Sequence, residues 1–285
     1  MSQPRNRWIV RIILALAVTA FVGVSVIPII SAINNPSSSN QNTASTSSSA
    51  PSSDQLSKLQ DEVRGYELVL QREPENQTAL NGLLQARLQL LSLKQGDIQG
   101  VIEPLEKLAK LNPEQTEYGV LLAQAKQQLG DQEGAAQAYR SILTTKPGDL
   151  KALQGMVALL LNEQRPEAAV DLLENTLSNA GQGNDVDTVA VQVLLGTVHA
   201  SQKRYPQATS AYNQAIKKDP QDFRPVLAKA MLLREQGNEE EAQPLFDSAS
   251  ALAPAQYKDE INRAAAPPPA APAELPETTS EESSE

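Results

Sequence analysis

The chain contains no cysteine, one histidine and few aromatic residues. Its 285 residues include three Phe, six Tyr and one Trp. Without cysteine the chain has no disulfide framework, thiol nucleophile, zinc finger or iron–sulfur cluster. The single histidine, His199, excludes a metal site built from several imidazoles. The core must therefore be built mainly from Leu, Ala and Val, which favours closely packed helices.

The charge of the chain is acidic and unevenly distributed. The formal net charge is −10, yet residues 1–53 carry three arginines and no acid, whereas residues 274–285 carry five glutamates and no base. An acidic body repels phosphate, so the composition argues against a nucleic-acid-binding surface. We interpret the acidic middle of the chain as the solvated exterior of helices.

The N-terminal region contains a long apolar segment without charge. Residues 12–33 are mostly Ile, Val, Ala and Leu. As a helix they span roughly 33 Å, close to the hydrocarbon core of about 30 Å. Arg5, Arg7 and Arg11 precede the segment, and Asp54 is the first charge after it. The positive-inside rule then predicts a transmembrane helix at 12–33, with the basic flank 1–11 in the cytoplasm and the remainder on the opposite side.

The alternative interpretation of this segment is a cleaved signal peptide, cut after Ala32. Ile30 would then lie three residues before the cut, where a small residue is preferred. The apolar run is also longer than a signal peptide needs, so an uncleaved anchor is favoured. Both interpretations place the following residues on the same side of the membrane.

Two segments have the composition of unstructured chain. Residues 34–53 are rich in Ser and Asn and carry no charge, which predicts a flexible linker of roughly 25 Å root-mean-square length. Residues 264–285 are rich in Pro and Ala and then acidic, which predicts a disordered tail.

Between these segments, residues 54–263 show a helical hydrophobic pattern that repeats every 34 residues. Pro113 and Pro147 are 34 apart, as are Pro220 and Pro254. Two further series keep nearly the same interval: Ala135, Ala169, Ala208 and Ala242, and Tyr139, Leu173, Tyr212 and Phe246. A fixed period of this length with helical spacing predicts stacked helical hairpins.

These residues resemble the tetratricopeptide repeat (TPR) family. Its 34-residue motif has large apolar residues at positions 4 and 7, small residues at 8, 20 and 27, Gly-Asp near 15 and 16, an aromatic at 24 and Pro at 32. The segment 189–222 matches with Leu195, Gly196, Tyr205, Ala208, Tyr212, Ala215 and Pro220. The resemblance implies repeats near 77–115, 116–149, 150–183, 189–222 and 223–256, with helical caps at 54–73 and 256–263.

We therefore predict an all-α TPR α-solenoid of about five helical hairpins plus a leading half repeat, preceded by one transmembrane helix. No catalytic motif is found. The only GxG, at 181–183, does not follow a strand, so it is not a dinucleotide-binding fingerprint. His199 falls at motif position 11, which packs within the hairpin. The expectation is a protein that is not an enzyme and holds no cofactor or metal.

In the family, the first helix of each hairpin lines a concave groove through positions 2, 5, 9, 12 and 13. From these positions the resemblance implies twelve groove candidates: Asn81, Gln85, Gln124, Gln127, Gln128, Gln154, Asn162, Val193, Thr197, Leu227, Met231 and Arg234. The Lys/Asn clamp that some members use for a C-terminal carboxylate is absent. The groove is instead neutral, amide-rich and partly apolar, which suits an extended or helical peptide of modest charge.

The chain looks like the membrane-anchored TPR proteins of bacterial envelopes and photosynthetic membranes. That resemblance implies a protein-binding scaffold or assembly factor that presents its groove to client proteins on the periplasmic or lumenal side of a bacterial-type inner membrane or thylakoid membrane. One alternative is a fixed structural subunit of a larger membrane-associated complex, including translocation or photosynthetic assembly machinery. Another is a secreted periplasmic TPR protein released by cleavage of the signal peptide.

Overall fold

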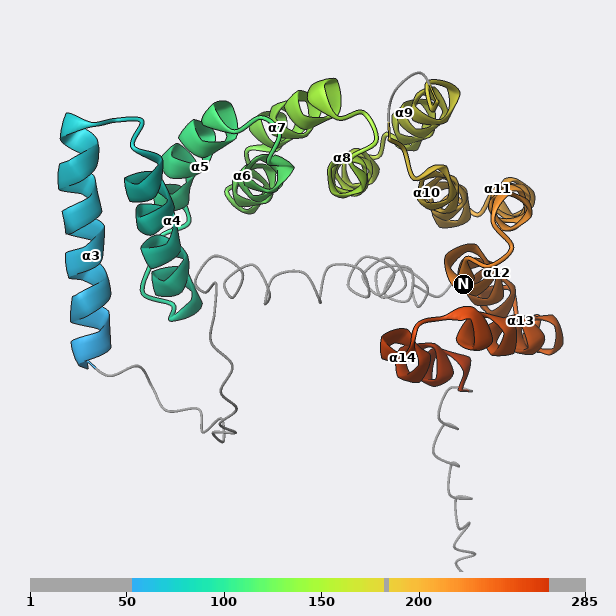
Figure 1. Ribbon diagram of the computed structural model, residues 1–285. Helices are drawn as coiled ribbons and strands as arrows, with labels where there is room; N and C mark the ends of the chain where they lie inside the picture. The colour runs from blue at the N-terminus through green and yellow to red at the C-terminus, as the bar shows by residue number, and fades with distance from the viewer. Residues whose placement is uncertain (1–52, 182–184, 267–285) are drawn as a thin grey trace, which may run out of the picture. The chain divides into compact units, whose positions relative to one another are not determined.

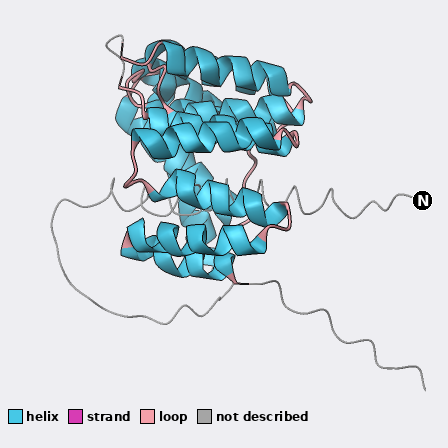
Figure 2. Cartoon of the chain, turned by 90° about the vertical axis from the view of Figure 1, so that its right-hand side faces the viewer, coloured by secondary structure: helices cyan, strands magenta, loops and turns pink. Residues whose placement is uncertain are grey.

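A computed structural model describes residues 53–181 and 185–266. The predicted transmembrane helix at 12–33 and the linker up to residue 52 lie outside the described residues, as does the tail from 267 onward. All regular structure in the described part is α-helical (Figure 2). None of the helices described there is long and apolar enough to cross a membrane.

The twelve described helices form a leading helix, five hairpins and a closing helix (Figure 1). The leading helix is α3 (Ser53–Arg72). The first helices of the hairpins, called A helices below, are α4 (Gln77–Ser92), α6 (Thr116–Gln128), α8 (Leu150–Asn162), α10 (Thr188–Ser201) and α12 (Phe223–Glu235). The second, B helices are α5 (Gln99–Leu111), α7 (Gln132–Thr145), α9 (Pro166–Ser178), α11 (Tyr205–Lys218) and α13 (Glu239–Leu252), and α14 (Ala255–Ala265) closes the series. The predicted all-α hairpin fold is confirmed.

These helices belong to two compact units, divided between Ala211 and Tyr212 within α11. In the first unit, α6 contacts α8 and α8 contacts α10, so the A helices form one layer. Figure 1 shows α5, α7 and α9 on the other side of this unit. In the second unit, Phe246 is buried among residues of α12, α13 and α14, and Tyr257 stacks on Phe223 with 5.4 Å between ring centroids.

Three positions on each B helix are buried in every hairpin. Motif positions 20, 24 and 27 are at most 7% exposed, and they are small, large and small in most repeats. The residues are Val101, Leu105 and Leu108; Ala135, Tyr139 and Ile142; Ala169, Leu173 and Thr176; Ala208, Tyr212 and Ala215; and Ala242, Phe246 and Ala249. Small residues allow close approach of helices, and the large one fills the remaining space.

Two tyrosine rings couple one repeat to the next. The ring of Tyr66 on α3 lies against Gly82 on α4, and the ring of Tyr139 on α7 lies against Gly155 on α8. A Cβ atom added to either glycine would lie 2.2 to 2.6 Å from atoms of the tyrosine side chain. Glycine is therefore required for the rings to pack at this distance.

The turn after each A helix begins with the same backbone conformation in all five hairpins. The second residue after the A helix has a positive φ, at Lys94 (58°), Gly130 (80°), Gln164 (61°), Lys203 (58°) and Gly237 (81°). In the last four hairpins this residue stands at motif position 15, whereas the turn between α4 and α5 is longer. This left-handed residue lets the chain reverse and satisfies carbonyls at the end of the A helix, as where the Asp131 amide donates to Lys126 O at 2.9 Å.

Candidate protein-interaction surfaces

Five of the twelve groove candidates are amides at exposed or half-buried positions of the first unit. Gln85 lies on α4, Gln124 and Gln128 on α6, and Gln154 and Asn162 on α8. None of the five side chains makes a hydrogen bond within the described residues. Because α6 contacts α8, the last four lie on neighbouring helices. We call these five residues the amide row.

Two other candidates are engaged within the protein. The Asn81 side-chain oxygen accepts a hydrogen bond from the Tyr118 hydroxyl at 2.9 Å, which joins α4 to α6. The Gln127 side-chain oxygen accepts from the Tyr139 hydroxyl at 3.3 Å. Asn81 therefore joins two A helices, whereas Gln127 joins the A helix α6 to the B helix α7.

The candidates on α10 offer less polar surface. Val193 and Thr197 are half-buried one helical turn apart. The Thr197 hydroxyl donates to the Val193 carbonyl at 2.9 Å, as threonines in helices commonly do. This part of the predicted surface is thus mainly apolar.

The second unit carries the remaining three candidates. Leu227 and Met231 pack against the core around Phe246. The Arg234 guanidinium lies over the Phe246 ring, 4.9 Å from its centroid, in a cation–π contact. These three side chains contribute to the packing of this unit and are only partly exposed.

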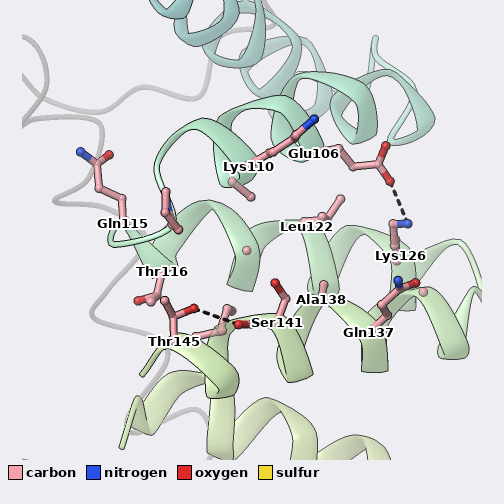
Figure 3. Close-up of a pocket in the computed structure, with 15 residues that line it drawn as sticks. Glu106, Lys110, Gln115, Thr116, Leu122, Lys126, Gln137, Ala138, Ser141 and Thr145 are labelled. Carbon is pink, nitrogen blue, oxygen red and sulfur yellow. Dashed lines mark hydrogen bonds and ion pairs between the residues drawn. The ribbon is translucent and has the colours of Figure 1, made fainter. Parts of the chain in front are cut away.

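A cavity lies elsewhere, between the B helices α5 and α7 over α6 (Figure 3). It has a volume of about 330 Å³ and is lined by none of the twelve candidates. Its floor includes Gly119 and Leu122, and the Lys126 ammonium pairs with the Glu106 carboxylate at 2.9 Å on its rim.

One sequence signal could have located this cavity. Gly119 stands at motif position 4, where other repeats bury Leu80, Leu153 and Val226. Gly119 contributes no side chain to the floor of the cavity, and the Ile142 side chain packs directly on it. Sequence reasoning missed the cavity because it considered only the concave positions.

A half-buried cation was also missed from the sequence. The Arg87 guanidinium on α4 donates to the Glu67 carboxylate at 2.6 Å and to the carbonyl of Gly100 on α5. Pro104 has no N–H to donate to that carbonyl, so the arginine replaces the missing helical hydrogen bond. Arg87 therefore connects α3, α4 and α5.

His199 lies half-buried on α10, with its Nδ1 atom buried and without a hydrogen-bond partner in the described residues. Burial lowers the pKa of His199, and the nearby Arg204 guanidinium lowers it further, against the opposing effect of Glu174 and Glu167. Arg204 also pairs with Glu167 through two hydrogen bonds, one of 2.9 Å, and this lowers the Glu167 pKa.

Across the described residues, no cluster of His, Asp and Glu is arranged to hold a metal ion. The polar groups brought together on the A helices are amides, which offer hydrogen bonds and no charge. Such a surface can bind a peptide backbone.

Comparison with known proteins agrees with this architecture. The family model described as tetratricopeptide repeat matches residues 77–253. The chain is 26% identical over 200 residues to protein SLOW GREEN 1, chloroplastic, of Arabidopsis thaliana, which covers 70% of this chain and 62% of that protein. It is 28% identical over 142 residues to cellulose synthase operon protein C of Pseudomonas fluorescens, and this similarity covers 48% of this chain and 11% of that protein.

Among solved structures, yeast Tom70 has a similar fold, with a TM-score of 0.50 and 15% identity over 76% of this chain and 43% of that one. The chain thus spans less than two thirds of the curated relatives it matches. Its fold is that of a protein-interaction scaffold. The match over residues 77–253, in register with the hairpins of the structure, shows that the chain belongs to the tetratricopeptide repeat family.

Proposed function

We propose that this protein is a membrane-anchored scaffold or assembly factor that holds a client protein against its A helices. The observation that carries the proposal is the amide row. Five side chains with unused donors and acceptors lie on three successive A helices, at positions where the family motif faces a peptide.

The chemistry of the amide row suits a peptide backbone. Each amide offers two N–H donors and one oxygen acceptor, as a peptide main chain requires. The neighbouring Val193 adds apolar contact on α10. The surface lacks a row of like charges, so the client segment is an extended or helical stretch of modest charge.

The membrane location rests on the sequence of residues 1–53. The apolar run at 12–33 and the arginines before it support an N-terminal anchor, with the repeats on the periplasmic or lumenal side. One curated relative is chloroplastic by name and the other is from a bacterium, which agrees with a chloroplast or a bacterial location. Tethering raises the effective concentration of a membrane-bound client, so modest affinity suffices.

Site-specific photo-crosslinking in the native membrane tests the binding surface. A photoreactive residue at Gln124 or Gln154 is expected to capture the same client, whereas one at the exposed Gln137 on α7 serves as the matched control. Replacing the other amide by Glu should reduce the crosslink, because a carboxylate cannot donate. Equal capture from Gln137 would place the contact on the B helices.

Equal crosslinking from Gln137 would favour another candidate function, that of a fixed subunit of a larger complex. The cavity between α5 and α7 is the observation that supports it, since a partner side chain could fill this space permanently. Stoichiometric co-purification with crosslinks from Gln137 would identify this role.

The orientation has its own test. A reporter that is active only outside the cytoplasm, fused after Ser53, should be active with the arginines in place. Activity of a cytoplasm-specific reporter at the same site would reverse the proposed topology.

A further inference from the structure

Helix α3 corresponds to a B helix of the motif, but it leaves exposed the face that the B helices of the five hairpins bury. Its ring at motif position 24 is Tyr66, so its positions 20 and 27 are Glu62 and Val69. Val69 is 40% exposed, whereas the five residues at position 27 elsewhere are at most 7% exposed. A Cβ atom added to Gly65, between them, would meet no atom within 4 Å.

In a complete hairpin, the A helix covers this face. In the complete hairpin of α6 and α7, the Ile142 side chain packs so closely on Gly119 that an added Cβ would lie 2.9 Å from it. Val69 corresponds to Ile142, but no A helix precedes α3 among the described residues. Residues 43–52 contain only Thr, Ala, Ser and Pro, so they lack the large apolar side chains that such a helix needs.

The exposed face carries a charge pattern that is complementary to itself. Lys58, Glu62, Gly65, Val69 and Arg72 are spaced alternately by four and three residues, so they lie along one side of α3. Neither Glu62 nor Arg72 forms an ion pair within the described residues. A parallel pairing of two such faces would place like charges together.

An antiparallel pairing places opposite charges of the two faces together. When Gly65 lies opposite Val69 of a second copy, twofold symmetry places Glu62 opposite Arg72 of that copy, and every contact occurs twice. Valine then fills the space that glycine leaves, as Ile142 does over Gly119. Charge and shape therefore select the same register.

We propose that α3 is a self-association surface through which two copies of this chain pair antiparallel. Each copy's α3 covers the face of the other that an A helix covers in a complete hairpin. The contact covers about three helical turns, so it buries less area than a standard protein interface. Confinement of both copies to one membrane raises their effective concentration and makes this small contact sufficient. The surface is separate from the amide row and is tested without any client.

The absence of cysteine makes the register directly testable. Full-length chains with Gly65→Cys and chains with Val69→Cys are mixed in liposomes and oxidised. Disulfides require Cα atoms within about 7 Å, so the mixture should give at least about tenfold more crosslinked dimer than either chain alone. The matched control is Gln60→Cys mixed with Arg64→Cys, two exposed residues with the same spacing on the opposite side of α3.

Charge reversal supplies the second arm. In the Gly65→Cys and Val69→Cys mixture, Glu62→Arg or Arg72→Glu alone should lower the yield about tenfold, since each places like charges opposite one another twice. Both reversals in the same chain should restore the yield. A mixture that crosslinks no better than the control, or a double reversal that stays low while circular dichroism shows folded chain, would overturn the proposal.

Discussion

The packing of Tyr139 on Gly155 gives a sharp prediction about coupling between repeats. The change is Gly155→Ala on α8. The new methyl group would lie 2.3 Å from the ring carbon Cζ, 2.4 Å from the hydroxyl oxygen and 2.5 Å from Cε1. The ring is 1% exposed and its hydroxyl is bonded to Gln127, so it cannot turn out of the way without breaking other contacts.

The magnitude follows from two opposing effects. Gly to Ala within a helix stabilises by about 1 kcal/mol, because alanine loses less backbone entropy on folding. Overpacking a closely packed core costs about 1 to 3 kcal/mol. We expect a net loss of about 1 kcal/mol at Gly155. At Gly65 nothing opposes the first effect, so Gly65→Ala should gain about 1 kcal/mol in local stability.

Native-state hydrogen exchange in dilute detergent solution measures both quantities locally. Amides of α7 and α8 should exchange about fivefold faster in Gly155→Ala, since 1.4 kcal/mol corresponds to a factor of about ten. Amides of α3 should exchange about fivefold more slowly in Gly65→Ala. Gly82→Ala provides an intermediate case, because its partner Tyr66 is only half-buried and can shift. Slower exchange in Gly155→Ala, matching Gly65→Ala, would refute the packing argument.

Two predictions concern pH. Because the pKa of His199 is lowered from 6.5 in the folded state, the unfolded state takes up the proton first, and stability falls as pH drops below about 6.5. His199→Gln should therefore reduce the change in thermal midpoint between about pH 7.5 and 5.5. An unchanged dependence of the midpoint on pH would exclude this histidine as the cause. Burial raises the pKa of Tyr139 to about 12, so stability falls as pH rises above about 10, where the unfolded state loses the proton. At about pH 12, Tyr139→Phe should retain roughly 2 to 3 kcal/mol of the free energy of unfolding that the natural protein loses. Urea unfolding followed by circular dichroism measures this, and the same dependence of unfolding free energy on pH in both proteins would contradict it.

Much of the fold could be predicted because the motif repeats. The interval between Pro113 and Pro147 and the alanines at position 20 are enough to identify most of the B helices from the sequence alone. The end of α14 was less predictable. The helix continues to Ala265, two residues past the predicted boundary, because alanine favours helix and the chain turns extended only at Ala266, before Pro267.

The interaction surface could be predicted only by position. The motif indicated which residues of an A helix face the groove, but not which of them the protein uses itself. Asn81 is occupied by Tyr118, a residue 37 positions away on the next A helix, and this contact depends on how two repeats stack. For the same reason the link from Arg87 to α5 could not be derived from either helix alone.

The hairpin turns differ in how well their residues suit the left-handed backbone at the second residue after the A helix. Glycine adopts it without cost at Gly130 and Gly237, whereas Lys94, Gln164 and Lys203 bear a steric penalty of about 1 kcal/mol each. In a linear array, such differences set where opening begins and where it stops. The hairpins closed by Gln164 and Lys203 are neighbours, so the chain carries a built-in weak stretch at α8 to α11, flanked along the sequence by two hairpins that glycine closes.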